Sequence, residues 1–161
     1  MHRANPHGMG FCTPNMYYKD IANFKVFLNK LRKRKITEPC LIHFRLATHG
    51  SIKKTNCHPF YDAKTGVYYA HNGVLDIKPV NDKTDSETAF KKRFLPVIKK
   101  YGFQSEELAA EVEQIIGNSK FVFMQCTKND TTDTIVNVRM FGNFEELDGC
   151  LYSNLRFISY L

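Results

Sequence analysis

The sequence predicts a single domain of the α+β class, with strands near both ends of the chain and helices in its middle. Residues 120–127 and 133–141 are rich in β-branched and aromatic side chains, whereas helix caps and stops punctuate residues 84–117. No repeat, low-complexity tract or linker divides the 161 residues, so we expect one domain over residues 1–161. The hydrophobic content of 43% is enough for a globular core.

In the first half of the chain, strands and one helix alternate. Residues 8–13 predict a short strand, and Asp20 is a plausible N-cap for a helix over 21–33, whose apolar residues recur near helical spacing. Pro39 then precedes a strand over 40–47, and residues 67–70 form another apolar, strand-like run.

Helices and then strands follow in the second half. Thr84 or Asp85 caps a helix over 85–101, in which Pro96 predicts a kink or an early stop, and a second helix begins after Ser105 and stops at Gly117.

The end of the chain is rich in strands. The segments 120–127 and 133–141, joined by the polar turn 128–131, predict a hairpin. Short strands are also expected at 150–152 and 156–160.

The chain is basic, with a formal net charge of +7. Much of the excess lies in residues 30–35 (KLRKRK) and 91–100 (KKRFLPVIKK), both on predicted helices. A basic surface permits binding to nucleic acid or anionic surfaces, but most such runs are solvated helix faces, and the chain has no recognised nucleic-acid motif.

Cysteine usage indicates a reducing compartment. The five cysteines are odd in number and include no C-x-x-C pair, so they fit neither a disulfide framework nor a structural zinc site. No stretch approaches the roughly 18 apolar residues of a membrane span, and no signal peptide opens the chain. We therefore expect free thiols, no membrane partner and a cytoplasmic location; the oligomeric state is left open.

Three polar clusters lie at the ends of predicted elements. The first is residues 43–50 (HFRLATHG), in which Arg45 stands on an apolar strand and Thr48, His49 and Gly50 end it. A strand arginine away from a plain solvent face meets either a ligand carboxylate or phosphate, or a structural ion pair.

The second and third clusters each have a structural and a functional interpretation. Asn72-Gly73 is a preferred hairpin turn, but an Asn amide beside a Gly N–H also makes a two-donor oxyanion hole. Asp85 is either a common helix cap or a carboxylate that binds a ligand's ammonium group.

The histidines do not predict a metal site. His43, His49, His58 and His71 lack the helical spacing of zinc hydrolases and have no carboxylate placed among them in a known pattern. Cys57 and His58 are adjacent, so on an extended chain they point opposite ways and do not pair. No metal or cofactor is expected.

Taken together, the clusters resemble the glutaminase domain of class II glutamine amidotransferases, which are N-terminal nucleophile hydrolases. The matching segments keep the order and approximate spacing of that family: 5–11 (NPHGMGF), 43–50, 56–60 (NCHPF), 70–73 (AHNG), 84–87 (TDSE) and 148–154 (DGCLYSN).

The resemblance implies a four-layer αββα sandwich that binds L-glutamine in a cleft between its sheets. It further implies that Arg45 binds the substrate α-carboxylate, that Asn72 and Gly73 form the oxyanion hole, and that Asp85 binds the α-ammonium group. Thr48 and His49 are expected to belong to the same substrate-binding site. The complete family hydrolyses the glutamine side-chain amide to glutamate and ammonia through a Cys thioester.

The chain also departs from the family. The family's nucleophile is a Cys at the mature N-terminus, whose own α-amino group acts as the base. Here the chain begins Met1-His2-Arg3, and His7 replaces the usual Asp. We expect the nucleophile, the first strand and the first helix to be missing, which means either a truncated chain or a non-catalytic relative.

The sequence thus predicts a glutamine amidotransferase-like protein, truncated or inactive as given, which acts on L-glutamine or a related amino acid. Two other functions stay open: a non-catalytic module that binds an amino acid or a peptide end, and a basic nucleic-acid-associated protein that uses residues 30–35.

Overall fold

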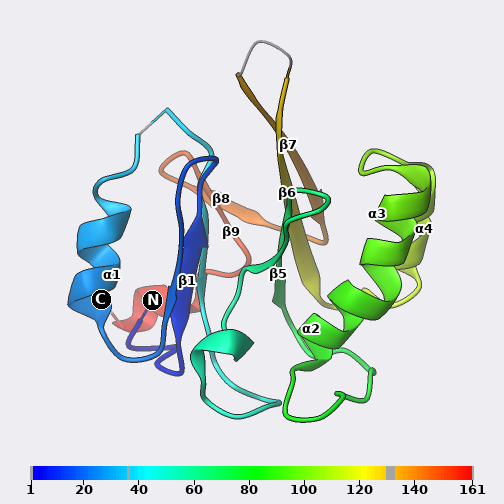
Figure 1. Ribbon diagram of the computed structural model, residues 1–161. Coiled ribbons are helices and arrows are strands. Elements are labelled where there is room, and N and C mark those ends of the chain that lie inside the picture. The colour runs from blue at the N-terminus through cyan, green and yellow to red at the C-terminus, as the bar shows by residue number, and fades with distance from the viewer. Residues whose placement is uncertain (1, 36, 130–132, 161) are drawn as a thin grey trace.

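The computed structural model describes residues 2–35, 37–129 and 133–160 and has four layers, in the order helix, sheet, sheet, helices (Figure 1). The first sheet has the strand order β2-β1-β3, and the second has the order β4-β5-β6-β7. The α+β class and the αββα layering expected from the sequence are confirmed.

The first two layers come from the N-terminal third of the chain. They contain β1 (Met9–Cys12), β2 (Tyr17–Asp20), α1 (Phe24–Leu31) and β3 (Leu41–Phe44). Both β2 and β3 pair antiparallel with β1. A core of aromatic and sulfur side chains, centred on Met9, Phe11 and Phe27, joins α1 to this sheet.

The second sheet consists of β4 (Phe60–Asp62), β5 (Val67–Asn72), β6 (Lys120–Lys128) and β7 (Thr134–Phe141), all antiparallel. The β6–β7 hairpin is confirmed, although residues 130 and 131 of its expected turn lie outside the described part of the chain.

Helices cover the outer face of this sheet. They are α2 (Asp85–Ala89), the π-helical turn η2 (Phe90–Phe94), α3 (Leu95–Tyr101) and α4 (Glu106–Glu113). Pro96 lies in the first turn of α3, where its missing N–H costs little, so the helical run continues through it after the π turn. The largest apolar core packs here, around Tyr69, Phe94 and Phe121.

Strand alternation decides which side chains face the gap between the sheets. On β5, Val67 and Tyr69 belong to the helix-side core, whereas Tyr68 packs with Cys12 and Met124 between the sheets. This intersheet cluster is small, and the polar ends of β3 and β5 lie beyond it.

Shorter elements complete the chain: η1 (Lys54–Asn56), the hairpin of β8 (Glu145–Leu147) and β9 (Cys150–Tyr152), and the 3₁₀ helix η3 (Arg156–Tyr160). None of the described helices has the length and apolar character needed to cross a membrane.

Three local predictions were wrong. The helix α4 ends at Glu113, four residues before the stop expected at Gly117. The N-cap of α1 is Asn23, whose side chain accepts from the Val26 N–H at 3.0 Å, whereas Asp20 ends β2 and accepts from the Ile21 N–H. Residues 156–160 form η3 rather than a strand, because local hydrogen bonds close the turn, among them Ile158 N–H to the Leu155 carbonyl at 3.0 Å.

Candidate functional site

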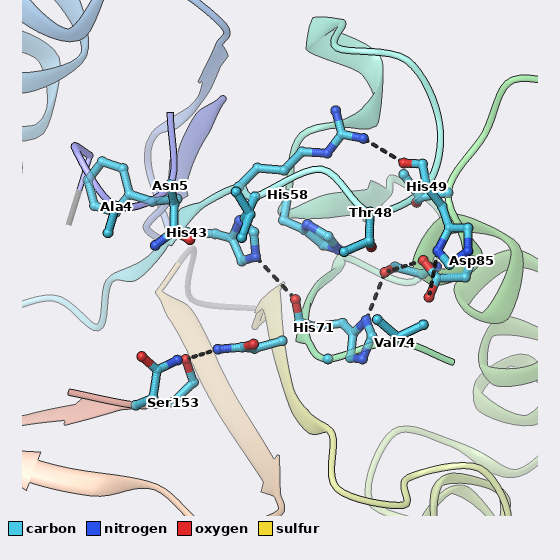
Figure 2. A pocket seen from close by; sticks show the side chains of 18 of the residues that line it. Ala4, Asn5, His43, Thr48, His49, His58, His71, Val74, Asp85 and Ser153 are labelled. Carbon is cyan, nitrogen blue, oxygen red and sulfur yellow. Dashed lines mark hydrogen bonds and ion pairs between the residues drawn. The ribbon is translucent and has the colours of Figure 1, made fainter. Parts of the chain in front are cut away.

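A cavity of about 470 Å³ opens beyond the intersheet cluster (Figure 2). Six parts of the described chain supply its walls: the segment before β1, β3 with the loop after it, the residue His58 before β4, the end of β5 with the residues that follow it, the start of α2, and the segment that follows β9. The lining residues are Ala4, Asn5, Ile42, His43, Phe44, Arg45, Leu46, Thr48, His49, His58, His71, Asn72, Gly73, Val74, Thr84, Asp85, Ser86, Ser153, Asn154 and Arg156.

Arg45 is a buried cation that organises the loop after β3. Its side chain is 3% exposed and donates to three main-chain carbonyls, those of His49 at 2.7 Å, Ser51 at 3.0 Å and Gly50 at 3.1 Å. Burial lowers the pKa of Arg45 from its usual value, yet a guanidinium stays charged at neutral pH. Within the described residues Arg45 bonds to main-chain carbonyls and forms no ion pair, so the structural ion pair considered from the sequence is not what holds it on this cavity wall.

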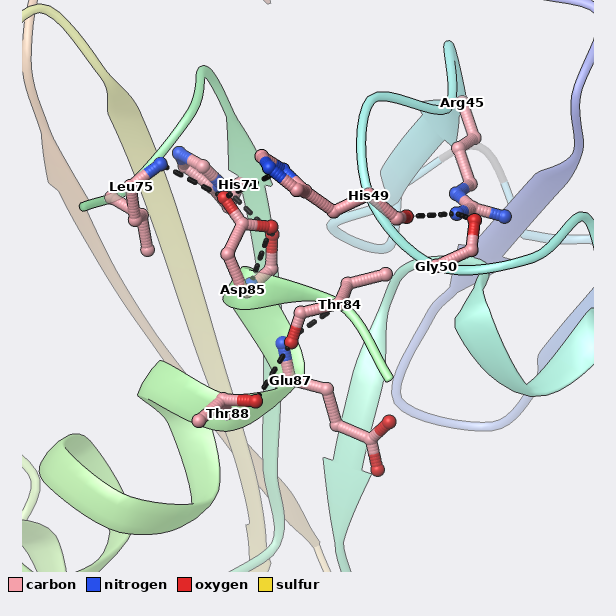
Figure 3. Close-up of polar contacts among 10 residues, drawn as sticks. Arg45, His49, Gly50, His71, Leu75, Thr84, Asp85, Glu87 and Thr88 are labelled. Atoms are coloured by element: carbon pink, nitrogen blue, oxygen red, sulfur yellow. Dashed lines mark hydrogen bonds and ion pairs between the residues drawn. The ribbon is translucent and has the colours of Figure 1, made fainter. Parts of the chain in front are cut away.

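Asp85 is the one carboxylate among the described cavity walls. It is 3% exposed and accepts from the Leu75 N–H and the Ser86 N–H, both at 2.8 Å, while His49 Nδ1 lies 4.0 Å from its Oδ2 (Figure 3). Thr84 is the N-cap of α2, because its hydroxyl accepts from the Glu87 N–H at 3.0 Å. Thr84, and not Asp85, therefore caps α2, and two N–H groups orient the Asp85 carboxylate.

Asn72 and Gly73 end β5 at the cavity rather than turning a hairpin, since the strands paired with β5 are β4 and β6. The Asn72 amide donates to the Ser153 hydroxyl at 2.5 Å. Gly73 has φ +141°, and a Cβ added there would lie 2.2 Å from Ser119 Oγ. Only glycine fits this position without strain.

Two buried histidines, His58 and His71, and the half-buried His43 form a neutral surface in the cavity. Burial lowers the pKa of His43 and His71 to about 4 and that of His58 well below its usual value. Among the described residues, His43 Nδ1, both ring nitrogens of His58 and His71 Nε2 find no hydrogen-bond partner. Within the described residues no group of three or more His, Cys, Asp or Glu is arranged to hold a metal ion.

All six residues singled out from the sequence lie on this one cavity: Arg45, Thr48, His49, Asn72, Gly73 and Asp85. Thr48 and His49 are exposed at its edge. The sequence pattern did not single out His58 or the residues after β9 as site residues. For Ser153 and Asn154 a signal existed, since they are polar residues directly after a predicted strand.

His7, which replaces the family's usual Asp, is a hydrogen-bond acceptor. Its Nδ1 accepts from the Ala47 N–H at 3.0 Å, and its own N–H donates to the Arg45 carbonyl at 3.0 Å. An imidazole with its proton on Nε2 can accept this bond as a carboxylate would. The substitution therefore keeps a side-chain acceptor beside the strand that carries Arg45.

No cysteine stands among the cavity-lining residues that the structure describes. Cys12 and Cys57 are fully buried, and burial raises the pKa of both thiols, with Arg45 opposing the shift at Cys57. Burial also raises the pKa of Cys40 to about 11. These thiols are therefore poor sources of thiolate at neutral pH.

Comparison with known proteins gives two matches. A sequence model of the family described as "Glutamine amidotransferases class-II" matches residues 25–122. A 33-residue segment is 52% identical to part of a protein named glutamine--fructose-6-phosphate aminotransferase (isomerizing) from Methanococcus maripaludis. That segment is 20% of this chain and 6% of the relative, so the similarity covers a short part of a longer protein.

Proposed function

Because this chain belongs to the class II glutamine amidotransferases, we propose that its cavity binds L-glutamine and holds the side-chain amide in position for attack by a thiolate. The observation that carries the proposal is the convergence of Arg45, Asn72 and Asp85 on one cavity. They come from three separate elements, and each supplies a group that a different part of glutamine requires.

Asp85 and Arg45 bind the two charged groups of the amino acid. The Asp85 carboxylate can accept from an ammonium group, since a carboxylate has about four acceptor sites, and two N–H groups and the Ser86 hydroxyl occupy only part of them. Arg45 has five N–H donors, of which three bond to main-chain carbonyls, and the other two are available to bind the α-carboxylate.

Asn72 and Gly73 stabilise negative charge on the side-chain oxygen. One N–H of the Asn72 amide is taken by Ser153, so the second N–H and the Gly73 backbone N–H form a two-donor oxyanion hole. The neutral histidines nearby leave the charge balance of the cavity to Arg45, Arg156 and Asp85.

The described cavity walls supply groups that recognise glutamine and no thiol that could attack it. In this family a thiolate attacks the side-chain carbon, ammonia leaves, and water converts the thioester to glutamate. No cysteine stands among the described cavity walls, and burial disfavours the thiolates of Cys12, Cys40 and Cys57. The binding of an amino acid without chemistry is the second candidate function, and it uses the same groups.

Calorimetry with L-glutamine and glutarate tests the proposal. We expect L-glutamine to bind more tightly, because glutarate lacks the ammonium group that Asp85 accepts. Asp85→Asn should weaken glutamine binding by about tenfold or more, as for loss of a charge-assisted hydrogen bond. Asp76→Asn is the matched control, since Asp76 is exposed and outside the cavity. Equal binding of the two ligands, or no effect of Asp85→Asn, would show that the assignment is wrong.

A further inference from the structure

We propose that Arg156 is a second cation of the glutamine site and binds the substrate α-carboxylate together with Arg45. This inference rests on the proposed function and adds a specificity-determining residue to it. Arg156 lies at the start of η3, beyond the end of the family match at residue 122.

The first observation is that Arg45 is largely committed to the protein. Three of its five donors bond to the carbonyls of residues 49–51, at 2.7 to 3.1 Å. A substrate carboxylate that accepts the remaining two N–H groups of Arg45 still has unused lone pairs. The charge of the Arg45 guanidinium is also already shared with the loop carbonyls that it binds. A second cation with uncommitted donors satisfies those lone pairs.

The second observation is that Arg156 lines the same cavity and has uncommitted donors. Across the described parts of the chain, no hydrogen bond or ion pair engages its guanidinium, and the residue is exposed at the cavity edge. Arg45 and Arg156 are the two guanidinium groups of the cavity walls, and Asp85 is the one carboxylate among the described wall residues. Since Asp85 is assigned to the ammonium group, both cations are left for the carboxylate.

The third observation is that the fold fixes where Arg156 stands. The Ser153 hydroxyl is bonded to the Asn72 amide at 2.5 Å, which ties the segment after β9 to the oxyanion hole. Asn154 Oδ1 accepts from the Arg156 N–H at 3.2 Å, and the Ser159 hydroxyl donates to the Arg156 carbonyl at 2.9 Å. These bonds hold the backbone of Arg156. Along the sequence it lies three residues after Ser153, whose hydroxyl contacts Asn72.

The test compares Arg156→Gln and Arg156→Lys with the wild-type chain, by calorimetry with L-glutamine and with L-glutamine α-amide, which lacks the carboxylate. Arg156→Gln should weaken L-glutamine binding by about tenfold, the effect of losing a charged hydrogen-bond partner. Arg156→Lys should give an intermediate affinity, because it keeps the charge and loses the fork. In Arg156→Gln the preference for L-glutamine over its α-amide should fall.

Arg32→Gln is the matched control, because Arg32 is exposed on the far end of α1 and lies outside the cavity. It should bind L-glutamine as the wild type does. Unchanged thermal unfolding of Arg156→Gln would show that the fold is intact. If the wild type binds L-glutamine and Arg156→Gln binds it equally well, the inference about Arg156 is wrong and the proposed function stands. If the wild type binds no L-glutamine, both are wrong.

Discussion

At Gly73 the backbone takes a conformation that L side chains rarely adopt, at the point where β5 enters the cavity. Its φ of +141° and the approach of Ser119 Oγ leave no room for a Cβ. The sequence showed an Asn-Gly pair but could not decide between a hairpin turn and a ligand site. The decision depends on which strands pair with β5, and that pairing is set by residues about 50 positions away.

Gly73→Ala should therefore destabilise the protein by about 3 kcal/mol or more, since backbone strain and overpacking each cost about 1–3 kcal/mol. Gly149→Ala is a matched control, because Gly149 also has a positive φ of +69° but has nothing within 4 Å of the added Cβ. It should cost about 1 kcal/mol. Urea unfolding of both variants measures the difference, and equal losses would contradict the close packing at Gly73.

The buried histidines predict a loss of stability in mild acid. Burial lowers the pKa of His43 and His71 to about 4, whereas an unfolded histidine titrates near 6.5. The unfolded chain therefore binds protons first as the pH falls, so stability is fully present above about pH 6.5 and declines toward pH 4. The slope is at most about 1.4 kcal/mol per pH unit for each histidine.

Urea unfolding at pH 7 and pH 5 measures this slope. His58→Gln should reduce it, because burial also lowers the pKa of His58. If the free energy of unfolding is the same at pH 7 and pH 5, the imidazoles are hydrated or paired in solution.

At the scale of elements, the sequence predicted most strands and helices, and the errors have local causes. Two polar residues near α1 could serve as its cap, and Asn23 has that role because Asp20 is bound within the turn after β2. The strands β2 and β4 were missed, since they are short edge strands with exposed tyrosines. Residues 156–160 have strand-like composition, but hydrogen bonds within the turn outweigh that propensity.

The cap of α2 links an element to the site. Thr84 bonds to the Glu87 N–H and precedes Asp85 directly, so Thr84→Ala should cost about 1 kcal/mol of stability and also weaken L-glutamine binding. Thr84→Ser should retain both. Ser105→Ala removes the cap of α4, which lies outside the cavity lining, and should cost similar stability with no change in binding. If Thr84→Ala and Ser105→Ala bind L-glutamine equally well, the cap of α2 has no effect on the site.

At the scale of the whole molecule, two sheets bring together groups that are far apart in sequence. Arg45, Asn72 and Asp85 could be chosen from the sequence because their polar clusters lie at the end of a strand or the start of a helix, and because the order of these clusters resembles the class II family. Arg156 could not, since its place depends on the bond between Ser153 and Asn72, 81 positions apart. Long-range contacts of this kind leave no periodic pattern in the sequence.

The same arrangement predicts that the chain releases no measurable ammonia from L-glutamine. The cavity offers recognition groups but no cysteine among its described walls, and loss of a nucleophile typically costs orders of magnitude in rate. A coupled glutamate assay checks this. Glutamate formation well above the blank, abolished by Arg45→Ala, would mean that another residue supplies the nucleophile.

An NMR titration of the ¹⁵N-labelled chain shows whether L-glutamine binds between the two sheets. We predict saturable shifts of the backbone amides of residues 49–51, 72–75 and 85–86, with D-glutamine giving much smaller shifts. The amides of α4 (Glu106–Glu113), outside the cavity lining, should not move. An absence of saturable shifts, or shifts confined to other surfaces, would contradict binding of L-glutamine between the sheets.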